Sequence, residues 1–498
     1  MSIQEYQPVI GLEVHAELQT RSKMFCACPV VDATTAEPNT AVCPVCAGMP
    51  GTLPVVNEKA VEYALRVALA LECTINQTSI FARKNYFYPD LPKGYQISQY
   101  ELPLARNGRL VMITSQGERT IRVRRVHLEE DTGKLTHLQT PDGRTYSLVD
   151  LNRAGVPLLE IVSEPDMHSV EEAVAYATTL RQILRYLGVN SGDMEKGVIR
   201  FEANVSVRPK GNQRLGTRTE IKNLNSFRAL ERAVAQEIER QIALLERGET
   251  VQQQTLGWNE AEQRLFAQRS KEEAHDYRYF PEPDLPPLVV EEAWLETVRA
   301  SLPELPRAKR QRFMAQYGLP AYDAQVLTQE RSVADFFEQT VAAAGEAVPP
   351  KMVANWITGE MFALWNASGR SAEDSPVAPE ALAELLGFVG RGQINQNTAK
   401  QVLAEMAQSG RSAQAIIEAR GLRQVSDEAQ IARWVDEVLA EFPKEVETYL
   451  NGKEGVANFL FGQVMRKARG KANPQVVRQV LLARLAQRKR LDEAPKLG

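Results

Sequence analysis

Apolar and ionisable residues alternate near the start of the chain, in the run from Gly11 to Leu18. Successive side chains of an extended backbone point to opposite faces, so this two-residue period predicts a β-strand with one apolar and one polar face. The polar face carries Glu13, His15 and Glu17. Carboxylates beside an imidazole are suitable ligands for Mg²⁺ or Mn²⁺, but a solvated edge strand shows the same alternation. Both interpretations stay open from this stretch alone.

The same alternation returns in residues 201–208 and 217–222, on either side of a turn-rich segment around Gly211. This arrangement predicts a β-hairpin. Its polar faces carry carboxylates together with cationic groups, namely Glu202, Arg208, Glu220 and Lys222. Three strands that each mix carboxylates with cationic or amide groups indicate one converging site, which can hold a metal ion, a phosphate chain and an acidic substrate.

Two long helices are predicted among these strands, at residues 169–187 and 226–247, and each stops at a glycine, Gly188 or Gly248. Helical periodicity dominates from residue 291 onward, with Pro303 and Pro306 at the boundary. The predicted fold class is therefore α+β. We expect a large mixed α/β domain with an antiparallel catalytic sheet at 1–293, an all-helical middle domain at 294–408 and a small helical tail domain at 409–498.

The composition, with 44% hydrophobic and 24% charged residues over 498 positions, is typical of a globular protein in water. The chain has no run of 18 apolar residues, no signal-peptide pattern and no space for a transit peptide before the first strand, so we expect a cytoplasmic protein without a membrane segment. Residues 451–498 contain eleven Lys/Arg and three Asp/Glu, whereas the whole chain has a net charge of −4. This basic tail indicates contact with a polyanion or, alternatively, a charged and solvated helix face.

Four of the five cysteines form two closely spaced pairs, Cys26 with Cys28 and Cys43 with Cys46. In a cytosolic chain such a group more often holds structural zinc than forms disulfides. Four thiolates leave zinc no open coordination position, so the predicted Zn²⁺ is structural and not catalytic. Cys73 falls in a helical pattern and is expected to be a small buried hydrophobic residue.

Several common catalytic motifs are missing. The sequence has no P-loop, no G-x-G-x-x-G and no G-x-S-x-G, which argues against a P-loop enzyme, a dinucleotide-binding enzyme and an α/β-hydrolase. Residues 127–134, which include Glu130, are expected to end a strand in an acidic turn, and an apolar run leads into Glu160. A glutamate in an apolar setting is costly unless it is paired or binds a metal. The aromatic loop 85–99 can stack on a nucleotide or an RNA 3′ end, or can be an ordinary packed loop.

Long motifs recur along the chain, at 11–15 (Gly-Leu-Glu-Val-His), 85–99, 127–134, 150–166, 220–227, 276–284 and 462–474. Together they resemble the family of B subunits of the bacterial aspartyl/glutamyl-tRNA amidotransferases, over nearly the full length. This resemblance implies an ATP-dependent carbon–nitrogen ligase. Such a ligase phosphorylates the side-chain carboxylate of Glu-tRNA(Gln) or Asp-tRNA(Asn) and then replaces the phosphate by ammonia. The implied partners are the glutamine-using amidase A subunit, a small C subunit in a heterotrimer, and the misacylated tRNA.

The resemblance also implies roles for particular residues. The implied Mg²⁺ ligands are His15, Glu130 and Glu160. The carboxylates expected near the site, where they bind a second metal or line the ammonia path, are Glu13, Glu202 and Glu220. The cations expected to neutralise the phosphates of ATP are Lys93, Arg208 and Lys222. The tail residues expected to contact the tRNA backbone are Lys467, Arg469 and Lys471. The position of Glu202 is more often Asp in the family, so direct metal binding by Glu202 stays open, and the four cysteines occur in only part of the family.

Two other interpretations compete with this one. The related archaeal subunit carries a large inserted domain, for which 498 residues leave no space. A non-catalytic tRNA-binding scaffold explains the basic tail, but a scaffold has no need of a carboxylate–histidine cluster. The sequence does not distinguish Glu-tRNA from Asp-tRNA as the substrate.

Overall fold

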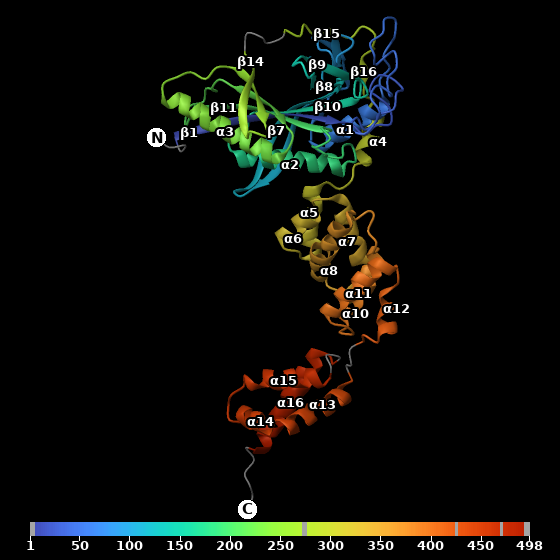
Figure 1. Ribbon diagram of the computed structural model, residues 1–498, viewed down its shortest axis with the longest axis vertical. Coiled ribbons are helices and arrows are strands. Elements are labelled where there is room, and N and C mark those ends of the chain that lie inside the picture. The colour runs from blue at the N-terminus through green and yellow to red at the C-terminus, as the bar shows by residue number, and fades with distance from the viewer. Residues whose placement is uncertain (1–4, 271–275, 424–426, 469–471, 493–498) are drawn as a thin grey trace, which may run out of the picture. The chain divides into compact units, whose positions relative to one another are not determined.

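The structure is a computed structural model that describes residues 5–270, 276–423, 427–468 and 472–492. The chain divides into two compact units, Met1–Pro306 and Arg307–Gly498 (Figure 1). The first unit is built on β-sheets and the second is helical. The α+β class predicted from the sequence is therefore confirmed.

The centre of the first unit is a sheet of nine strands, counted over the described residues, in the order β14-β13-β12-β11-β1-β10-β7-β6-β2. Its strands are β1 (Tyr6–Glu17), β2 (Thr74–Ile75), β6 (Ala105–Thr114), β7 (Gly117–Glu130), β10 (Pro157–Ser163), β11 (Ile199–Pro209), β12 (Thr219–Leu224), β13 (Gln254–Asn259) and β14 (Arg264–Ser270). Neighbouring strands are antiparallel, except that β12 and β13 are parallel. The strand predicted near the N-terminus and the hairpin predicted around residue 211 are β1, β11 and β12.

Three smaller sheets complete the unit. The three-stranded sheet consists of β15 (Phe280–Pro281), β4 (Ala82–Asn85) and β5 (Tyr95–Ser98). The two-stranded sheets pair β3 (Thr78–Ser79) with β16 (Leu288–Val289) and β8 (Lys134–Gln139) with β9 (Thr145–Asp150). Strand β5 lies against the end of β7, where Ser98 donates a hydrogen bond to Glu129. The small sheet therefore reaches the polar face of the large one.

The helices of this unit are α1 (Glu58–Ala70), α2 (Val170–Tyr186), α3 (Phe227–Glu246) and α4 (Glu292–Ala300). Ser169 and Ser226 cap α2 and α3, because each side chain accepts a hydrogen bond from the backbone N–H three residues later. Gly188 and Gly248 follow these helices with φ of 67° and 74°, a left-handed conformation that favours glycine. Both helices predicted from the sequence are confirmed.

The hydrophobic core explains why one face of the sheet is left for chemistry. Leu12 and Val14 of β1 are fully buried and belong to the same core as Tyr176 of α2 and Leu230 of α3. In Figure 1, α2 and α3 lie along one side of the central sheet. Burial of each large apolar side chain contributes about 1.5–3 kcal/mol to folding. Because side chains alternate along a strand, the polar residues of β1 face away from these helices.

The second unit contains two hydrophobic cores. The first is formed by α5 (Pro306–Tyr317), α6 (Ala321–Leu327), α7 (Arg331–Ala344), α8 (Pro350–Trp356), α9 (Phe362–Ser368), α10 (Pro379–Gly390), α11 (Gln396–Ser409) and α12 (Ala413–Arg420), with a 3-10 turn at Gly345–Ala347 and a π turn at Ile357–Met361. The second is formed by α13 (Glu428–Glu441), α14 (Pro443–Leu450), α15 (Val456–Lys467) and α16 (Pro474–Asp492). Ile416 and Ile417 belong to the first core, and the second begins with Ile431. The predicted boundaries of three domains stay a prediction.

No helix within the described ranges has both the length and the apolar character that crossing a lipid bilayer requires.

Candidate active site

Polar residues of four neighbouring strands line up across the central sheet. In the strand register, His127 of β7 lies opposite Glu160 of β10, Glu160 lies opposite His15 of β1, and His15 lies opposite Arg200 of β11. Residues that are directly opposite in a sheet point to the same face. The row therefore forms a polar strip on the face that α2 and α3 do not cover.

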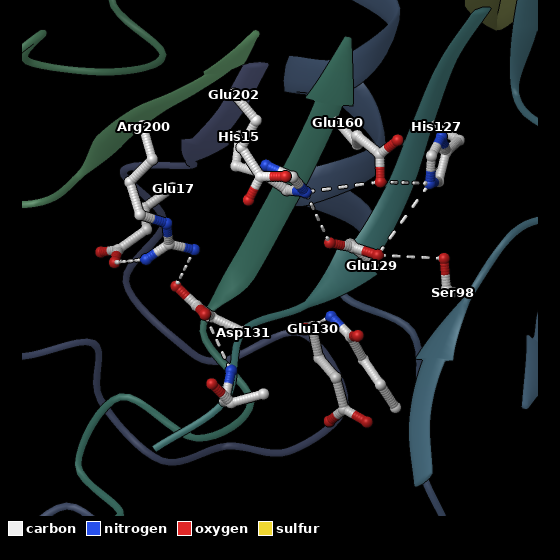
Figure 2. Close-up of polar contacts among 12 residues, drawn as sticks. His15, Glu17, Ser98, His127, Glu129, Glu130, Asp131, Glu160, Arg200 and Glu202 are labelled. Atoms are coloured by element: carbon white, nitrogen blue, oxygen red, sulfur yellow. Dashed lines mark hydrogen bonds and ion pairs between the residues drawn. The ribbon is translucent and has the colours of Figure 1, made fainter. Parts of the chain in front are cut away.

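The first cluster on this strip consists of His15, Glu129 and Glu160 (Figure 2). Nε2 of His15 lies 3.4 Å from Oε2 of Glu160 and 3.6 Å from Oε1 of Glu129. His127 approaches from the other side, with its Nε2 3.3 Å from Oε2 of Glu160. Ser98 donates a hydrogen bond of 3.1 Å to the second oxygen of Glu129. One ligand atom each from His15, Glu129 and Glu160 therefore lies within 4.8 Å of the other two.

The geometry of this cluster fits a small divalent cation. Mg²⁺ binds oxygen ligands at about 2.0–2.1 Å in an octahedron, so neighbouring ligand atoms lie about 3.0 Å apart. The observed 3.4 Å and 3.6 Å need only a small contraction. Glu129 and Glu160 are only 2% and 6% exposed, and buried carboxylates are retained where they are paired or bind a metal. The residues present thus suit a resident Mg²⁺ or Mn²⁺.

The charges within the cluster strongly shift the pKa values of His15 and Glu160. Burial opposes protonation of His15, but the carboxylates of Glu160, Glu202 and Glu129 outweigh it and raise the pKa of His15 to about 9. Burial also opposes ionisation of Glu160, but His127 and His15 hold its pKa well below the ordinary value. Without a metal, His127 and His15 together balance the charge of Glu160.

A second carboxylate cluster adjoins the first and consists of Glu13, Glu202 and Glu220. Lys222 bridges two of its members, with Nζ 2.8 Å from Glu202 and 3.4 Å from Glu220. Burial, followed by repulsion from Glu160 and Glu202, raises the pKa of Glu13. The structure thus brings together the three carboxylates that the resemblance implied, although Lys222 occupies the position of a counter-charge.

A third polar group lies further along β1, around Glu17. Burial and the neighbouring Asp131 raise the pKa of Glu17 to about 8. Arg200 and Arg153 lower the pKa of Asp131 to about 2 in spite of its burial, and Arg200 donates to Asp131 at 2.9 Å. Figure 2 shows Glu17, Arg200 and Asp131 beside the first cluster. At pH 7 Glu17 is therefore mainly protonated, whereas Asp131, paired with Arg200, is ionised.

Glu130 does not join the cluster to which the sequence assigned it. It is the neighbour of Glu129 on β7, and consecutive strand residues face opposite sides, so its side chain points away from His15 (Figure 2). Its carboxylate forms an ion pair with Lys93 and accepts a hydrogen bond of 2.9 Å from the backbone of Ile97. The structure thus places Glu129, and not Glu130, beside His15 and Glu160, and the Mg²⁺ ligands implied by the resemblance stay a prediction.

The Glu130–Lys93 pair instead borders a cavity of about 210 Å³ next to the cysteine segment, whose lining includes Cys26, Cys46 and Gly155. Lys93 therefore pairs with Glu130 on the opposite side of β7 and does not face the carboxylates of the first cluster.

Two other predicted contacts also have local partners. Arg208 donates to the side-chain oxygen of Gln7 at 3.0 Å and 3.1 Å and to the backbone of Gln213 at 3.1 Å. In the second unit, Lys467 pairs with Glu437 at 2.9 Å and with Glu441. The predicted RNA contacts Arg469 and Lys471 lie outside the described residues.

The four clustered cysteines come together as predicted. The sulfur of Cys46 lies 3.9 Å from those of Cys28 and Cys43, and all four sulfurs lie within 4.8 Å of one another. Zinc at about 2.3 Å from four sulfurs places them about 3.8 Å apart, so the donor set fits tetrahedral zinc. The ammonium of the fully buried Lys23 lies 3.6 Å from the sulfur of Cys46. Cys73 is buried, as expected.

Sequence reasoning missed several polar residues that the structure brings to the site, namely Lys84, Arg125, His127, Glu129, Asp131 and Arg200. Part of this group had a signal in the sequence. The end of β7 shows the same two-residue period that identified β1. Its polar residues Arg125, His127 and Glu129 are separated by the apolar residues Val126 and Leu128. Lys84 comes from another sheet and had no such signal.

Comparisons with known proteins agree with one another. The family model described as "GatB/GatE catalytic domain" matches residues 8–296, and the one described as "GatB domain" matches residues 335–485. An aspartyl/glutamyl-tRNA(Asn/Gln) amidotransferase B subunit of Moorella thermoacetica is 55% identical over 481 residues, which cover 97% of this chain and 100% of the relative. Proteins of the same name from Thermodesulfovibrio yellowstonii and Myxococcus xanthus are each 52% identical, covering 96% and 97% of this chain and 98% and 100% of their own lengths. The chain therefore belongs to the family of aspartyl/glutamyl-tRNA(Asn/Gln) amidotransferase B subunits.

Proposed function

We propose that this chain is the component of a tRNA-dependent amidotransferase that activates the side-chain carboxylate of Glu-tRNA(Gln), Asp-tRNA(Asn) or both with ATP. Family membership over nearly the whole length supports the amidotransferase role, since relatives with that name align with 97% of the chain. The observation that carries the assignment of the reaction to the N-terminal unit is the buried cluster of His15, Glu129 and Glu160. A protein that only held tRNA would have no use for such a cluster.

In the proposed reaction His15, Glu129 and Glu160 hold Mg²⁺, with the second carboxylate cluster beside them. Magnesium, when bound, neutralises part of the charge of the ATP phosphates. His127, 3.3 Å from Glu160, orients that carboxylate. Lys222 balances the charge of Glu202 and Glu220, which keeps these acidic groups compatible with an anionic substrate.

Activation by phosphate is chemically necessary because a carboxylate is a poor electrophile. The side-chain carboxylate takes the γ-phosphoryl group of ATP, which gives an acyl phosphate and ADP. Ammonia then forms the new C–N bond at the acyl carbon, and phosphate leaves with the electron pair of the C–O bond. Ammonia loses a proton as the C–N bond forms, and the departing phosphate takes up that proton.

The cofactors and partners follow from the same assignment. We infer that Cys26, Cys28, Cys43 and Cys46 hold a structural Zn²⁺, which cross-links the loop beside the Glu130–Lys93 cavity. The relatives are named as B subunits of an amidotransferase, and we infer a heterotrimer with an amidase A subunit that supplies ammonia and a small C subunit. The basic tail, with Lys467, Arg469 and Lys471, is proposed to contact the tRNA backbone, and the cytoplasm is the proposed location.

The test uses the full chain assembled with its amidase and small subunits. Glu-tRNA(Gln) and Asp-tRNA(Asn) are supplied separately with ATP, Mg²⁺ and glutamine, and the amino acid released from the tRNA is analysed. Conversion to Gln or Asn that requires ATP supports the proposal and identifies the substrate. An assembly that binds both tRNAs but converts neither would favour the alternative of a non-catalytic scaffold.

A further inference from the structure

Cationic side chains near the carboxylates of the site are mostly paired. Lys222 lies 2.8 Å from Glu202, and Arg125 lies 3.4 Å from Glu160. Lys84 of β4 differs, because it has no carboxylate oxygen within 4.0 Å among the described residues. A cation without a carboxylate partner, next to a cluster of acidic groups, is available for an anionic ligand.

The three-stranded sheet holds Lys84 against the first cluster. In the register of β4 and β5, Lys84 lies opposite Gln96. Ala82 lies opposite Ser98, and this pair is on the same face of the sheet. Ser98 donates to the carboxylate of Glu129 at 3.1 Å, and Gln96 donates to the backbone oxygen of Glu130 at 2.6 Å. The face that carries Lys84 is therefore fixed to the end of β7 by two hydrogen bonds.

Aromatic rings hold the Lys84 ammonium instead of an acidic partner. Its Nζ lies 5.0 Å from the ring centre of Tyr277 and 5.9 Å from that of Tyr86, and these two rings meet edge to face at 5.9 Å. Such contacts attract the ammonium group without neutralising its charge. Burial opposes the charge, but Glu129 above all raises the pKa of Lys84 beyond its ordinary value. The side chain is thus a fixed cation directed at the carboxylate cluster.

We propose that the ammonium of Lys84 binds the phosphoryl group transferred from ATP, an inference that rests on the function proposed above. In the transfer step, an oxygen of the substrate carboxylate forms a bond to the γ-phosphorus. The bond from phosphorus to the β,γ-bridging oxygen breaks, and its electron pair leaves with ADP. Lys84 donates to a non-bridging oxygen of the moving phosphoryl group, where negative charge must be stabilised. The aromatic contacts keep the donor in place before ATP arrives, so little reorganisation is needed.

The competing explanation is that Lys84 only balances the charge of Glu129 and Glu160. The two explanations differ in what a neutral side chain would change. A charge-balancing lysine affects binding of the metal ion and folding stability, whereas a phosphoryl-binding lysine affects the rate of ADP formation. If the reaction requires a cationic hydrogen-bond donor at position 84, an arginine there should restore the rate of ADP formation.

The test compares Lys84→Met and Lys84→Arg in the full chain assembled with its amidase and small subunits. ADP formation is measured with misacylated tRNA at varied ATP, and binding of Mn²⁺ is measured by titration. We expect Lys84→Met to lower kcat about 10²- to 10³-fold, the usual cost of a lost donor to developing negative charge. Lys84→Arg should recover kcat to within about tenfold, and Mn²⁺ affinity should change by less than about threefold in both variants.

Lys59 on α1 provides the matched control. Its Nζ also lies 5.0 Å from a tyrosine ring centre, that of Tyr63, but the side chain is exposed and pairs with Glu62 at 2.7 Å. Lys59→Met should leave kcat unchanged. If the wild-type assembly forms no ADP with misacylated tRNA, the proposed function itself is overturned. If the wild type is active and Lys84→Met keeps its kcat within about threefold, or loses Mn²⁺ affinity in parallel with kcat, only the role of Lys84 is overturned.

Discussion

The neighbours Glu129 and Glu130 offer the most informative substitution in the site. Both are buried, with exposures of 2% and 3%, yet they face opposite sides of β7. Glu129 lies 3.6 Å from the imidazole of His15, whereas Glu130 pairs with Lys93. Replacing each in turn by Gln removes one charge at nearly constant volume. The two variants therefore separate the proposed metal ligand from an ion pair within one dipeptide.

Glu129→Gln is expected to weaken metal binding strongly. Loss of a partner outside the ligand shell typically costs about 10- to 100-fold in metal affinity, so a direct ligand should cost at least about 100-fold, or about 2.7 kcal/mol. The hydrogen bond from Ser98 can persist, because the Gln amide also offers an oxygen acceptor. Without metal, Glu129→Gln removes the repulsion from Glu160 but also the attraction of Glu129 for His15 and Lys84, so metal affinity, not stability, is the quantity that identifies the ligand.

Glu130→Gln is expected to show the opposite pattern. It removes the charge-assisted bond to Lys93, which costs about 1.5–3 kcal/mol of unfolding free energy, and leaves the first cluster intact. Mn²⁺ titration of each full-length variant, followed by urea unfolding without metal, gives both quantities. A Glu130→Gln protein that loses Mn²⁺ while Glu129→Gln binds it normally would refute the assignment of the ligands.

Three further predictions concern other parts of the chain. The pKa of Glu17 is raised to about 8, so the folded state keeps a proton that the unfolded state loses above about pH 4.5. Stability should therefore fall by up to about 1.4 kcal/mol per unit between pH 5 and 8, and Glu17→Gln should remove this slope in urea unfolding; an unchanged slope would contradict the argument. Cys46→Ser should abolish the one zinc per chain measured by metal analysis, and retention of a full equivalent would exclude the proposed site. Lys467→Ala should reduce the slope of log tRNA affinity against log salt by about 0.9 if Lys467 contacts a phosphate; an unchanged slope would exclude that contact.

Regular strands explain how much of the site could be predicted from the sequence. His15 and Glu160 lie in unbroken strands, where the two-residue period alone determines which face each side chain takes. Ser169 and Gly188 likewise mark the ends of α2 by local backbone chemistry. Such features depend on near neighbours in the chain, so no knowledge of the tertiary structure is needed to find them.

The other site residues could not be predicted, because their positions depend on the strand register and on contacts between separate sheets. Glu129 and Glu130 differ by one position, and a shift of one residue moves a side chain to the opposite face of the sheet. The resemblance identified the segment that contains both glutamates but not which of the two side chains faces His15. Lys84 reaches the cluster only because β5 is fixed to the end of β7 by Ser98 and Gln96. No periodicity in the sequence encodes such a contact between separate sheets.

The most direct test of the central claim is single-turnover amidation by the full assembly, comparing the wild type with Glu160→Gln. Glu160 touches both His15 and His127 and lies at the centre of the first cluster. We expect the wild type to convert misacylated tRNA in an ATP-dependent manner. Glu160→Gln should bind the same tRNA with equal affinity but form neither ADP nor amidated product. Wild-type turnover by Glu160→Gln would show that this cluster is not where the carboxylate is activated.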